Sequence, residues 1–194
     1  MRYAQATWRV GPVSKLGYTG ATVRTGKGVV LHSAEGGLST MMDILDSGAR
    51  KSWCFSNPKS GPLLQHYEIE AVTWHAGYEA NRLYVGVEHE GMAGELLTPT
   101  QIANDIELIR WLDRVEHWPG FERRLTLWEH NEFMATACPI GRIPWASIVE
   151  RLTHKPVDEL AIRVMCTNLA VLCLQGKLQE CSDSLAYIGV RPSG

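Results

Sequence analysis

The sequence predicts an α/β domain, in which a mixed central sheet of about five or six short strands is flanked by helices, followed by a C-terminal helical extension. Short apolar or alternating runs occur along the chain between segments of helical periodicity, which favours this class. Turns rich in glycine and proline separate the segments. A length of 194 residues suits one sizeable domain with a short appendage. We place the domain at residues 1–153 and the extension at residues 154–194.

Several segments have the composition of short strands. The segment 83–91 alternates most clearly, with Val87 and His89 on one face and Glu88 on the other. The turn formers of residues 57–62 predict a hairpin between the segments on either side of them. The expected strands are 28–31, 51–56, 63–67, 71–74, 83–91 and 125–128.

The clearest helix signal lies at residues 98–116. The segment opens with TPTQ, which combines a capping box with a proline at the first helical position, and an apolar stripe follows. A second helix is expected from Ser39, as its N-cap, to about Asp46. A third is expected at residues 144–152.

Composition excludes several classes of function. The formal net charge of −2 predicts no nucleic-acid partner. No run approaches the roughly 20 apolar residues of a membrane span, so no membrane insertion is expected. The N-terminus lacks the apolar segment of a secretory signal peptide. Five cysteines without paired short spacings predict reduced thiols in a protein made in a cytoplasm, and we expect a monomer.

The segment HNEFMATACPIGRIPW is a candidate metal-binding loop. His130 and Cys138 lie within nine residues of each other, and a Pro-x-Gly turn follows them. His32, at the end of an expected strand, is a third residue of a type that binds zinc well. A catalytic zinc site uses three protein ligands and keeps a fourth position open. By spacing alone, however, a histidine at a strand end is more often a hydrogen-bonded core or surface residue.

The motifs from Gly28 to Ile148 resemble the zinc amidase family that includes phage lysozyme-type amidases, bacterial cell-wall amidases and peptidoglycan recognition proteins. They occur in the family's order over some 120 residues. The stretch SWCFSNPKSGPLLQHY is similar to endolysin amidase domains from phages of actinobacteria. The motifs are GVVLHSAEGG around His32, TWHAG around His75, VGVEHEG around Glu88, and the candidate metal-binding loop.

The resemblance implies a role for each matched residue. His32, His130 and Cys138 match the family's zinc ligands, the third of which is Asp in some members. Thr136 matches the position where members carry Lys or Thr to steady the oxyanion. Glu88 matches the glutamate that serves as general base in part of the family.

Residues that match the cleft of the family are expected to contact substrate. His75 and its neighbour Trp74 belong to the cleft-lining motif. Trp53 stands where many members have a tyrosine that assists at the metal-bound water. Because an indole offers only an N–H donor, Trp53 cannot act as a base, and more weight falls on Glu88. Cys54, next to Trp53, is expected to be a packing residue.

Other titratable residues have ordinary explanations. Without the resemblance, Glu88 reads as a strand-edge carboxylate paired with Arg82 or Lys51. The resemblance assigns no role to four histidines, which are expected at the surface or behind the ligands: His66, His89, His117 and His154.

The function implied by the resemblance is zinc-dependent hydrolysis of the amide between N-acetylmuramic acid and L-alanine in bacterial peptidoglycan. Without a signal peptide, an endolysin would be made in a host cytoplasm and act on the wall after release. Three alternatives stay open. A cytoplasmic recycling amidase would usually carry Asp in place of Cys138. A non-catalytic peptidoglycan binder would usually lose that thiol, and a closed structural zinc site would need Cys54 or His75 as its fourth ligand.

The C-terminal extension is read from periodicity alone. Residues 157–174 predict one helix and residues 177–187 a shorter one. Cys166 and Cys173 share a face of the first helix and are expected to be buried thiols. The extension is either a wall-binding appendage or, as we expect, a pair of helices that pack on the domain.

Overall fold

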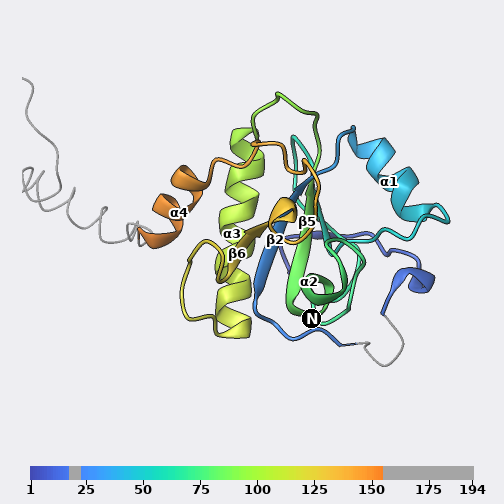
Figure 1. Ribbon diagram of the computed structural model, residues 1–194, viewed down its shortest axis with the longest axis horizontal. Helices are drawn as coiled ribbons and strands as arrows, with labels where there is room; N and C mark the ends of the chain where they lie inside the picture. The colour runs from blue at the N-terminus through green and yellow to red at the C-terminus, as the bar shows by residue number, and fades with distance from the viewer. Residues whose placement is uncertain (18–22, 155–194) are drawn as a thin grey trace, which may run out of the picture. The chain divides into compact units, whose positions relative to one another are not determined.

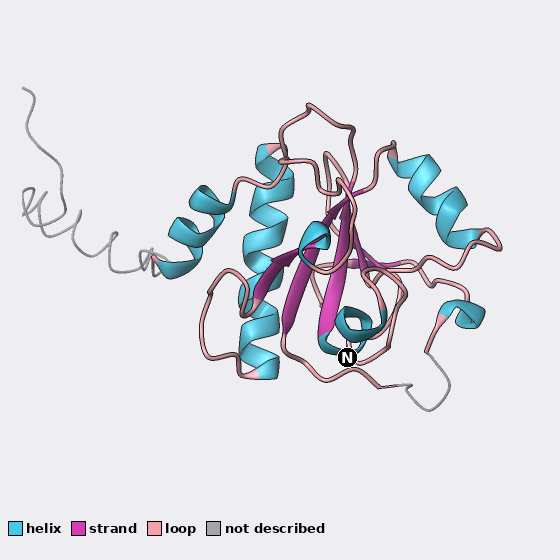
Figure 2. Ribbon diagram, in the orientation of Figure 1, coloured by secondary structure: helices cyan, strands magenta, loops and turns pink. Residues whose placement is uncertain are grey.

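The computed structural model describes residues 1–17 and 23–154 and shows a six-stranded mixed sheet with helices around it (Figures 1 and 2). The predicted fold class is confirmed. The extension helices and their two cysteines lie outside the described residues. In sequence order the strands are β1 (Thr7–Trp8), β2 (Gly28–Ser33), β3 (Phe55–Asn57), β4 (Leu64–Gln65), β5 (Tyr84–His89) and β6 (Leu127–Glu129). The helices are α1 (Leu38–Asp46), α2 (Tyr78–Leu83), α3 (Pro99–Glu116) and α4 (Trp145–Thr153), with 3₁₀ turns η1 (Val13–Lys15) and η2 (His130–Glu132).

Strands β2 and β5 form the centre of the sheet, whose order is β1-β4-β3-β5-β2-β6. They run parallel, and their register places His32 opposite Glu88. Strands β3 and β6 extend this parallel core on its two sides. Strands β3 and β4 pair antiparallel, as expected of the predicted hairpin. All six residues of β2 are buried, which is typical of a parallel strand covered on both faces.

The two faces of β5 meet different parts of the protein. His89 points toward α3, where its Nε2 lies 2.9 Å from the buried carboxylate of Asp105. Glu88 points to the opposite face because neighbouring side chains alternate along a strand. On the α3 face, Val87 and Leu31 share one core cluster with Ile106. Helix α4 packs beside α3 (Figure 1). No helix among the described residues combines the length and apolar character needed to cross a membrane.

Residues 71–74 do not form the predicted strand. Two isolated bridges pair this segment with Val23 and Leu16. Its backbone groups are instead satisfied in part by side chains, since the N–H of Trp74 donates to the Ser52 hydroxyl at 2.9 Å. A short apolar run cannot reveal such side-chain partners, so the strand prediction was wrong here.

Two helix starts show where local signals succeed and fail. The capping box of α3 is present as predicted, with Thr98 accepting from the backbone N–H of Gln101. For α1 the N-cap is Gly37, without a side-chain cap, and Ser39 lies inside the helix. The carboxylate of Glu90 takes over the capping role, accepting from the N–H of Leu38 at 3.1 Å. Helix α2 was not predicted, because six residues are too few to show a helical stripe.

His66 is fully buried and contacts none of the three candidate ligands, so it lies neither at the surface nor behind the ligands as expected. Its Nδ1 lies 2.8 Å from the carbonyl oxygen of Arg9 and its Nε2 lies 2.8 Å from the Ser56 hydroxyl. A carbonyl only accepts, so Nδ1 carries the hydrogen and Nε2 accepts from Ser56. Burial lowers the pKa of His66 to about 4, so the ring stays neutral in the folded protein.

The free energy of unfolding is expected to fall as the pH drops from about 6.5 toward 4. In that window the unfolded chain protonates His66 while the folded protein resists protonation, which favours unfolding by up to roughly 3 kcal/mol. Urea denaturation at pH 7 and pH 4.5 measures this loss. A His66→Gln variant should lose less stability between the two pH values than the wild type. Equal losses of unfolding free energy in the two proteins would contradict the lowered pKa of His66.

Candidate metal centre and active site

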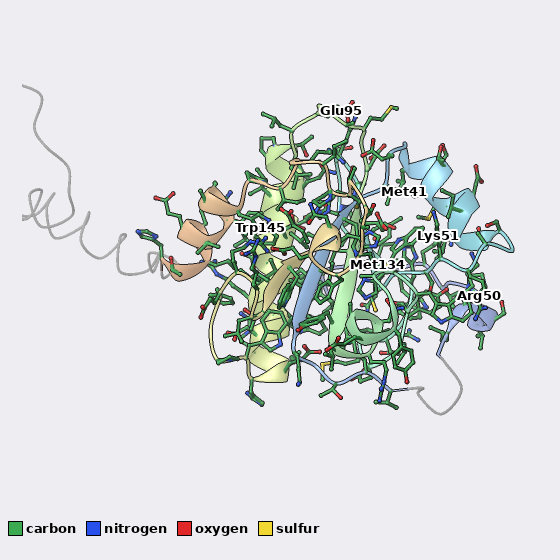
Figure 3. The ribbon with its side chains drawn as sticks, in the orientation of Figure 1. Met41, Arg50, Lys51, Glu95, Met134 and Trp145 are labelled. Carbon is green, nitrogen blue, oxygen red and sulfur yellow. The ribbon has the colours of Figure 1, made fainter. Side chains whose placement is uncertain are left out.

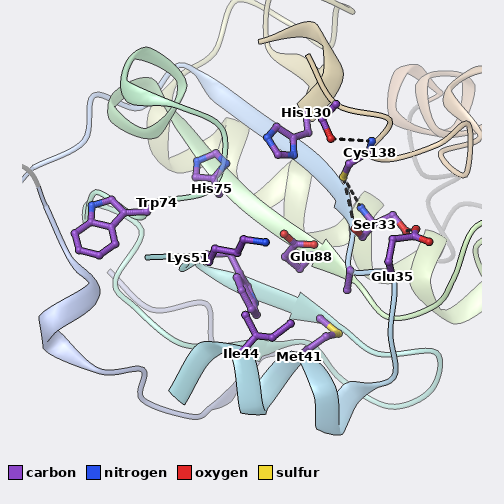
Figure 4. A pocket seen from close by; sticks show the side chains of 13 residues that line it. Ser33, Glu35, Met41, Ile44, Lys51, Trp74, His75, Glu88, His130 and Cys138 are labelled. Atoms are coloured by element: carbon purple, nitrogen blue, oxygen red, sulfur yellow. Dashed lines mark hydrogen bonds between the residues drawn. The ribbon is translucent and has the colours of Figure 1, made fainter. Parts of the chain in front are cut away.

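Three potential ligands meet at the carboxyl end of the central strands. His32 lies in β2, His130 begins the 3₁₀ turn that follows β6, and Cys138 lies in the loop beyond. One ligand atom from each of the three lies within 4.8 Å of the others. Figure 4 shows the side chains of His130 and Cys138 beside the carboxylate of Glu88. The structure therefore brings together the three residues selected from the sequence.

The nitrogen donors of this cluster lack other partners. His32 Nδ1 and His130 Nε2 are both buried and make no hydrogen bond. Such atoms are rare in folded proteins, because an unpaired buried polar group is costly. Burial, with the nearby Glu88 carboxylate, raises the pKa of the Cys138 thiol to about 12. A bound cation would satisfy both nitrogens and favour the thiolate. Two imidazoles and one thiolate are a donor set that suits zinc.

Backbone contacts hold the loop of Cys138 against the sheet. The N–H of Ser33 donates to Cys138 Sγ at 3.1 Å, and the N–H of Asn131 donates to the Cys138 carbonyl at 3.0 Å. Arg142, only 2% exposed, donates to the Ser33 hydroxyl at 2.7 Å and to the Glu90 carbonyl at 3.0 Å. Arg142 thus ties the end of this loop to the ends of β2 and β5. No motif or periodicity in the sequence indicates this role of Arg142.

Glu88 faces the three ligands from the neighbouring strand. Its Oε1 lies 3.7 Å from His32 Nδ1, and its Oε2 is buried without a hydrogen-bond partner. Burial raises the pKa of Glu88 to about 7, against smaller opposite effects of His89 and Lys51. No ion pair with Arg82 or Lys51 occurs in the described part of the chain. The ordinary explanation of this carboxylate therefore has no structural support.

A cavity of about 280 Å³ opens in front of these groups. Trp53 and Trp74 both line it. Their indole N–H groups are already engaged, with the Ser56 hydroxyl and the Gly17 carbonyl at 2.7 Å each, so they offer the cavity apolar faces rather than donors. The full lining is Ser33, Ala34, Glu35, Met41, Ile44, Lys51, Trp53, Trp74, His75, Glu88, His130, Thr136 and Cys138.

Residues 22–141 match the model of a protein family described as N-acetylmuramoyl-L-alanine amidase. The match covers more than half of the chain. The chain belongs to this amidase family. The matched segment contains every site residue that the sequence analysis selected, from His32 to Cys138.

Solved structures share the fold of this amidase. The structure of PlyL has a TM-score of 0.62 at 14% identity, covering 78% of this chain and 99% of that one. The N-acetylmuramoyl-L-alanine amidase LysC from Clostridium intestinale URNW has a TM-score of 0.57 at 22% identity, covering 80% and 96%. An AmpD derivative has a TM-score of 0.63 at 16% identity, covering 79% and 97%. At these identities the likeness concerns the fold alone. No curated protein matches the chain.

Two polar side chains from separate segments, Thr136 and Lys51, line the cavity. Thr136 Oγ1 accepts from the N–H of Cys138 at 3.3 Å, which leaves the hydroxyl hydrogen to donate. Lys51 extends into the cavity toward Glu88 (Figure 4). Burial lowers the pKa of His130, and the charge of Lys51 lowers it further. From the sequence Lys51 was considered only as an ion-pair partner, so its place in the cavity was missed.

Among the described residues, the cluster that could hold a metal ion has three members rather than four. Cys54 is fully buried, and its thiol faces the Glu68 carbonyl at 3.9 Å, outside the cluster. His75 lines the cavity, but its two nitrogens contact His32 Nε2 at 3.0 Å and the Tyr84 carbonyl at 3.2 Å. Neither residue belongs to the cluster, so a closed set of four ligands is not found among the described residues.

Proposed function

We propose that this amidase hydrolyses the amide bond between the lactyl group of N-acetylmuramic acid and L-alanine in peptidoglycan, with zinc held by His32, His130 and Cys138. One observation carries the proposal: two unpartnered imidazole nitrogens and a thiol form one cluster, and a carboxylate with an unpartnered oxygen lies beside it at the cavity. Zinc bound there would polarise the scissile carbonyl and lower the pKa of its water.

Glu88 is the general base and acid in this mechanism. It takes a proton from the attacking water and returns it to the amine of the departing L-alanine. A pKa of about 7 suits both transfers, because a carboxylate and its acid are then both accessible near neutral pH. The position of Glu88 beside His32 places the carboxylate next to the metal ligands.

Thr136 and Lys51 stabilise the negative charge that develops on the carbonyl oxygen. Thr136 offers its hydroxyl hydrogen from the metal-binding loop, and Lys51 contributes a positive charge from the segment before β3. Groups aimed at developing charge act most strongly in a partly water-excluded cavity. In this chain the cation therefore comes from the segment before β3, while the metal-binding loop supplies a neutral threonine.

Lys51→Met is expected to lower kcat/KM on cell walls by about 10²-fold, the typical loss when one group that stabilises the oxyanion is removed. The matched control is Lys59→Met, which removes an equal charge from an exposed lysine paired with Glu95 at 2.8 Å. The control should keep wild-type kcat/KM. Equal rates for the two variants would exclude Lys51 from catalysis.

The shape of the cavity supports action on an assembled wall. A second hollow of about 460 Å³ shares Lys51, Trp74, His75 and His130 with the first, so the two form one groove. Arg50 and Lys51 reach this extended part from one loop and Met134 from another (Figure 3). A groove that continues past the metal ligands suits a polymer with attached peptides better than a small soluble fragment. We therefore infer an endolysin-type role rather than recycling of soluble muropeptides.

Product analysis on purified peptidoglycan tests the proposed function. New amino termini on L-alanine are expected, without new reducing sugar ends, and release should be faster from intact walls than from soluble muropeptides. New reducing ends would show that a glycosidic bond is cut. Tight wall binding without any new amino terminus would identify a non-catalytic binder instead.

A further inference from the structure

We infer that His75 is a positioning residue that holds His32 in the tautomer and ring orientation in which its Nδ1 binds the metal. The inference rests on the proposed metal site. It assigns His75 a role behind the ligands, where the family resemblance implied only contact with substrate.

The direction of the hydrogen bonds follows from a chain of three groups. His75 Nε2 lies 3.2 Å from the carbonyl oxygen of Tyr84, which can only accept, so this nitrogen carries the hydrogen. A neutral imidazole has one N–H, so His75 Nδ1 is an acceptor. His32 Nε2, at 3.0 Å from that nitrogen, must therefore be the donor. This leaves the lone pair of His32 on Nδ1, the atom that is buried without a partner.

Both rings are buried, and the two nitrogens of His75 contact a ring nitrogen and a carbonyl oxygen rather than a carboxylate, so the assignment takes both imidazoles as neutral. The two rings meet edge to face with centroids 5.2 Å apart, so the ring edge of His32 that carries Nε2 is the one that faces His75.

The fold holds His75 in place from two sides. The N–H groups of His75 and Ala76 both donate to the side-chain oxygen of Asn81, at 2.9 and 2.8 Å. On the sheet side, a Cβ at Gly86 would lie 2.6 Å from Cγ of His75. Glycine at this position in β5 is therefore what lets the imidazole lie against the strand. An imidazole that only lined the cavity would not need these hydrogen bonds or the close contact with Gly86.

Two substitutions of His75 separate this role from simple packing. His75→Leu fills much of the space but removes the acceptor, whereas His75→Asn keeps an oxygen acceptor the same number of bonds from Cβ as Nδ1. Zinc affinity measured by competition with a chromogenic chelator should fall about 10–100-fold in the leucine variant, as for other groups that orient metal ligands. The asparagine variant should retain most of the affinity. Wild-type affinity in the leucine variant, or equal weakening in both, would overturn the inference.

The tautomer itself can be observed in the metal-free protein. Long-range ¹H–¹⁵N correlation spectra should show His32 with its hydrogen on Nε2 in the wild type and in His75→Asn. In His75→Leu both tautomers should be present. A hydrogen on Nδ1 of His32 in the wild type would overturn the inference. The spectra also distinguish failure of the proposed metal site from failure of this inference. A wild type that binds no zinc would contradict the metal site, whereas the spectra of the metal-free protein would still test the hydrogen bond between His32 and His75.

His66→Gln is the control for general loss of stability. It alters a buried histidine that also bonds a backbone carbonyl and one side chain, but that touches none of the three ligands. Its zinc affinity should equal that of the wild type. If it weakened zinc binding as much as His75→Leu, the effect would be a consequence of destabilisation and the positioning role would be excluded.

Discussion

Cys138→Ser is expected to abolish zinc binding and wall hydrolysis together. A serine hydroxyl does not supply the thiolate that completes the ligand set, and two imidazoles alone leave the ion with too few protein ligands. The loss of zinc affinity should exceed the 10–100-fold typical of changes behind the ligands. Metal content after dialysis and dye release from labelled walls measure the two effects. If walls are still hydrolysed after the zinc is gone, the proposed mechanism is wrong.

Cys54→Ser is the matched control for this experiment. Cys54 is the other cysteine in the described part of the chain, and it is fully buried away from the cluster. A serine there should cost stability, because a hydroxyl replaces a thiol among apolar groups, but zinc content and activity per folded molecule should stay at wild-type values. A parallel loss of zinc in both variants would point to unfolding rather than to loss of a ligand.

The sequence predicted the parts of the site that depend on strand patterns and short motifs. The apolar run of β2 and the alternation of β5 predicted the two strands that carry His32 and Glu88, and the parallel register of the structure then sets these residues side by side. The loop motif brought His130 and Cys138 to the same edge. These features are local, since each needs only the residues of one strand or turn and the rule that parallel strands end together.

The parts that escaped prediction depend on contacts between distant segments. The His75 ring meets His32 across 43 positions, and Arg142 reaches Ser33 across 109. Neither contact leaves a periodic trace in the sequence. Lys51 was missed because its position in the cavity depends on how the segment before β3 packs against β5. Tertiary packing, rather than propensity, decides where such long polar side chains end.

Glu88→Gln is expected to lower kcat by about 10²–10⁴-fold while zinc stays bound, because the amide cannot accept the proton of the attacking water. The variant should fold at least as stably as the wild type in the metal-free state. It replaces a buried carboxylate that has an unpartnered oxygen with a neutral side chain of the same shape. Initial rates on cell walls, zinc content and urea denaturation measure the three quantities.

Glu90→Gln should show the reverse pattern. Glu90 lies two residues further along the chain, where its carboxylate accepts from the backbone N–H groups of Leu38 and Lys59 at 3.1 and 2.8 Å. Removing its charge at the start of α1 should cost roughly 1 kcal/mol of stability and leave kcat unchanged. A loss of kcat in Glu88→Gln alone, with a loss of stability in Glu90→Gln alone, would assign a catalytic role to Glu88 and a structural role to Glu90. A Glu88→Gln enzyme with wild-type kcat would require the proton to be carried by another group.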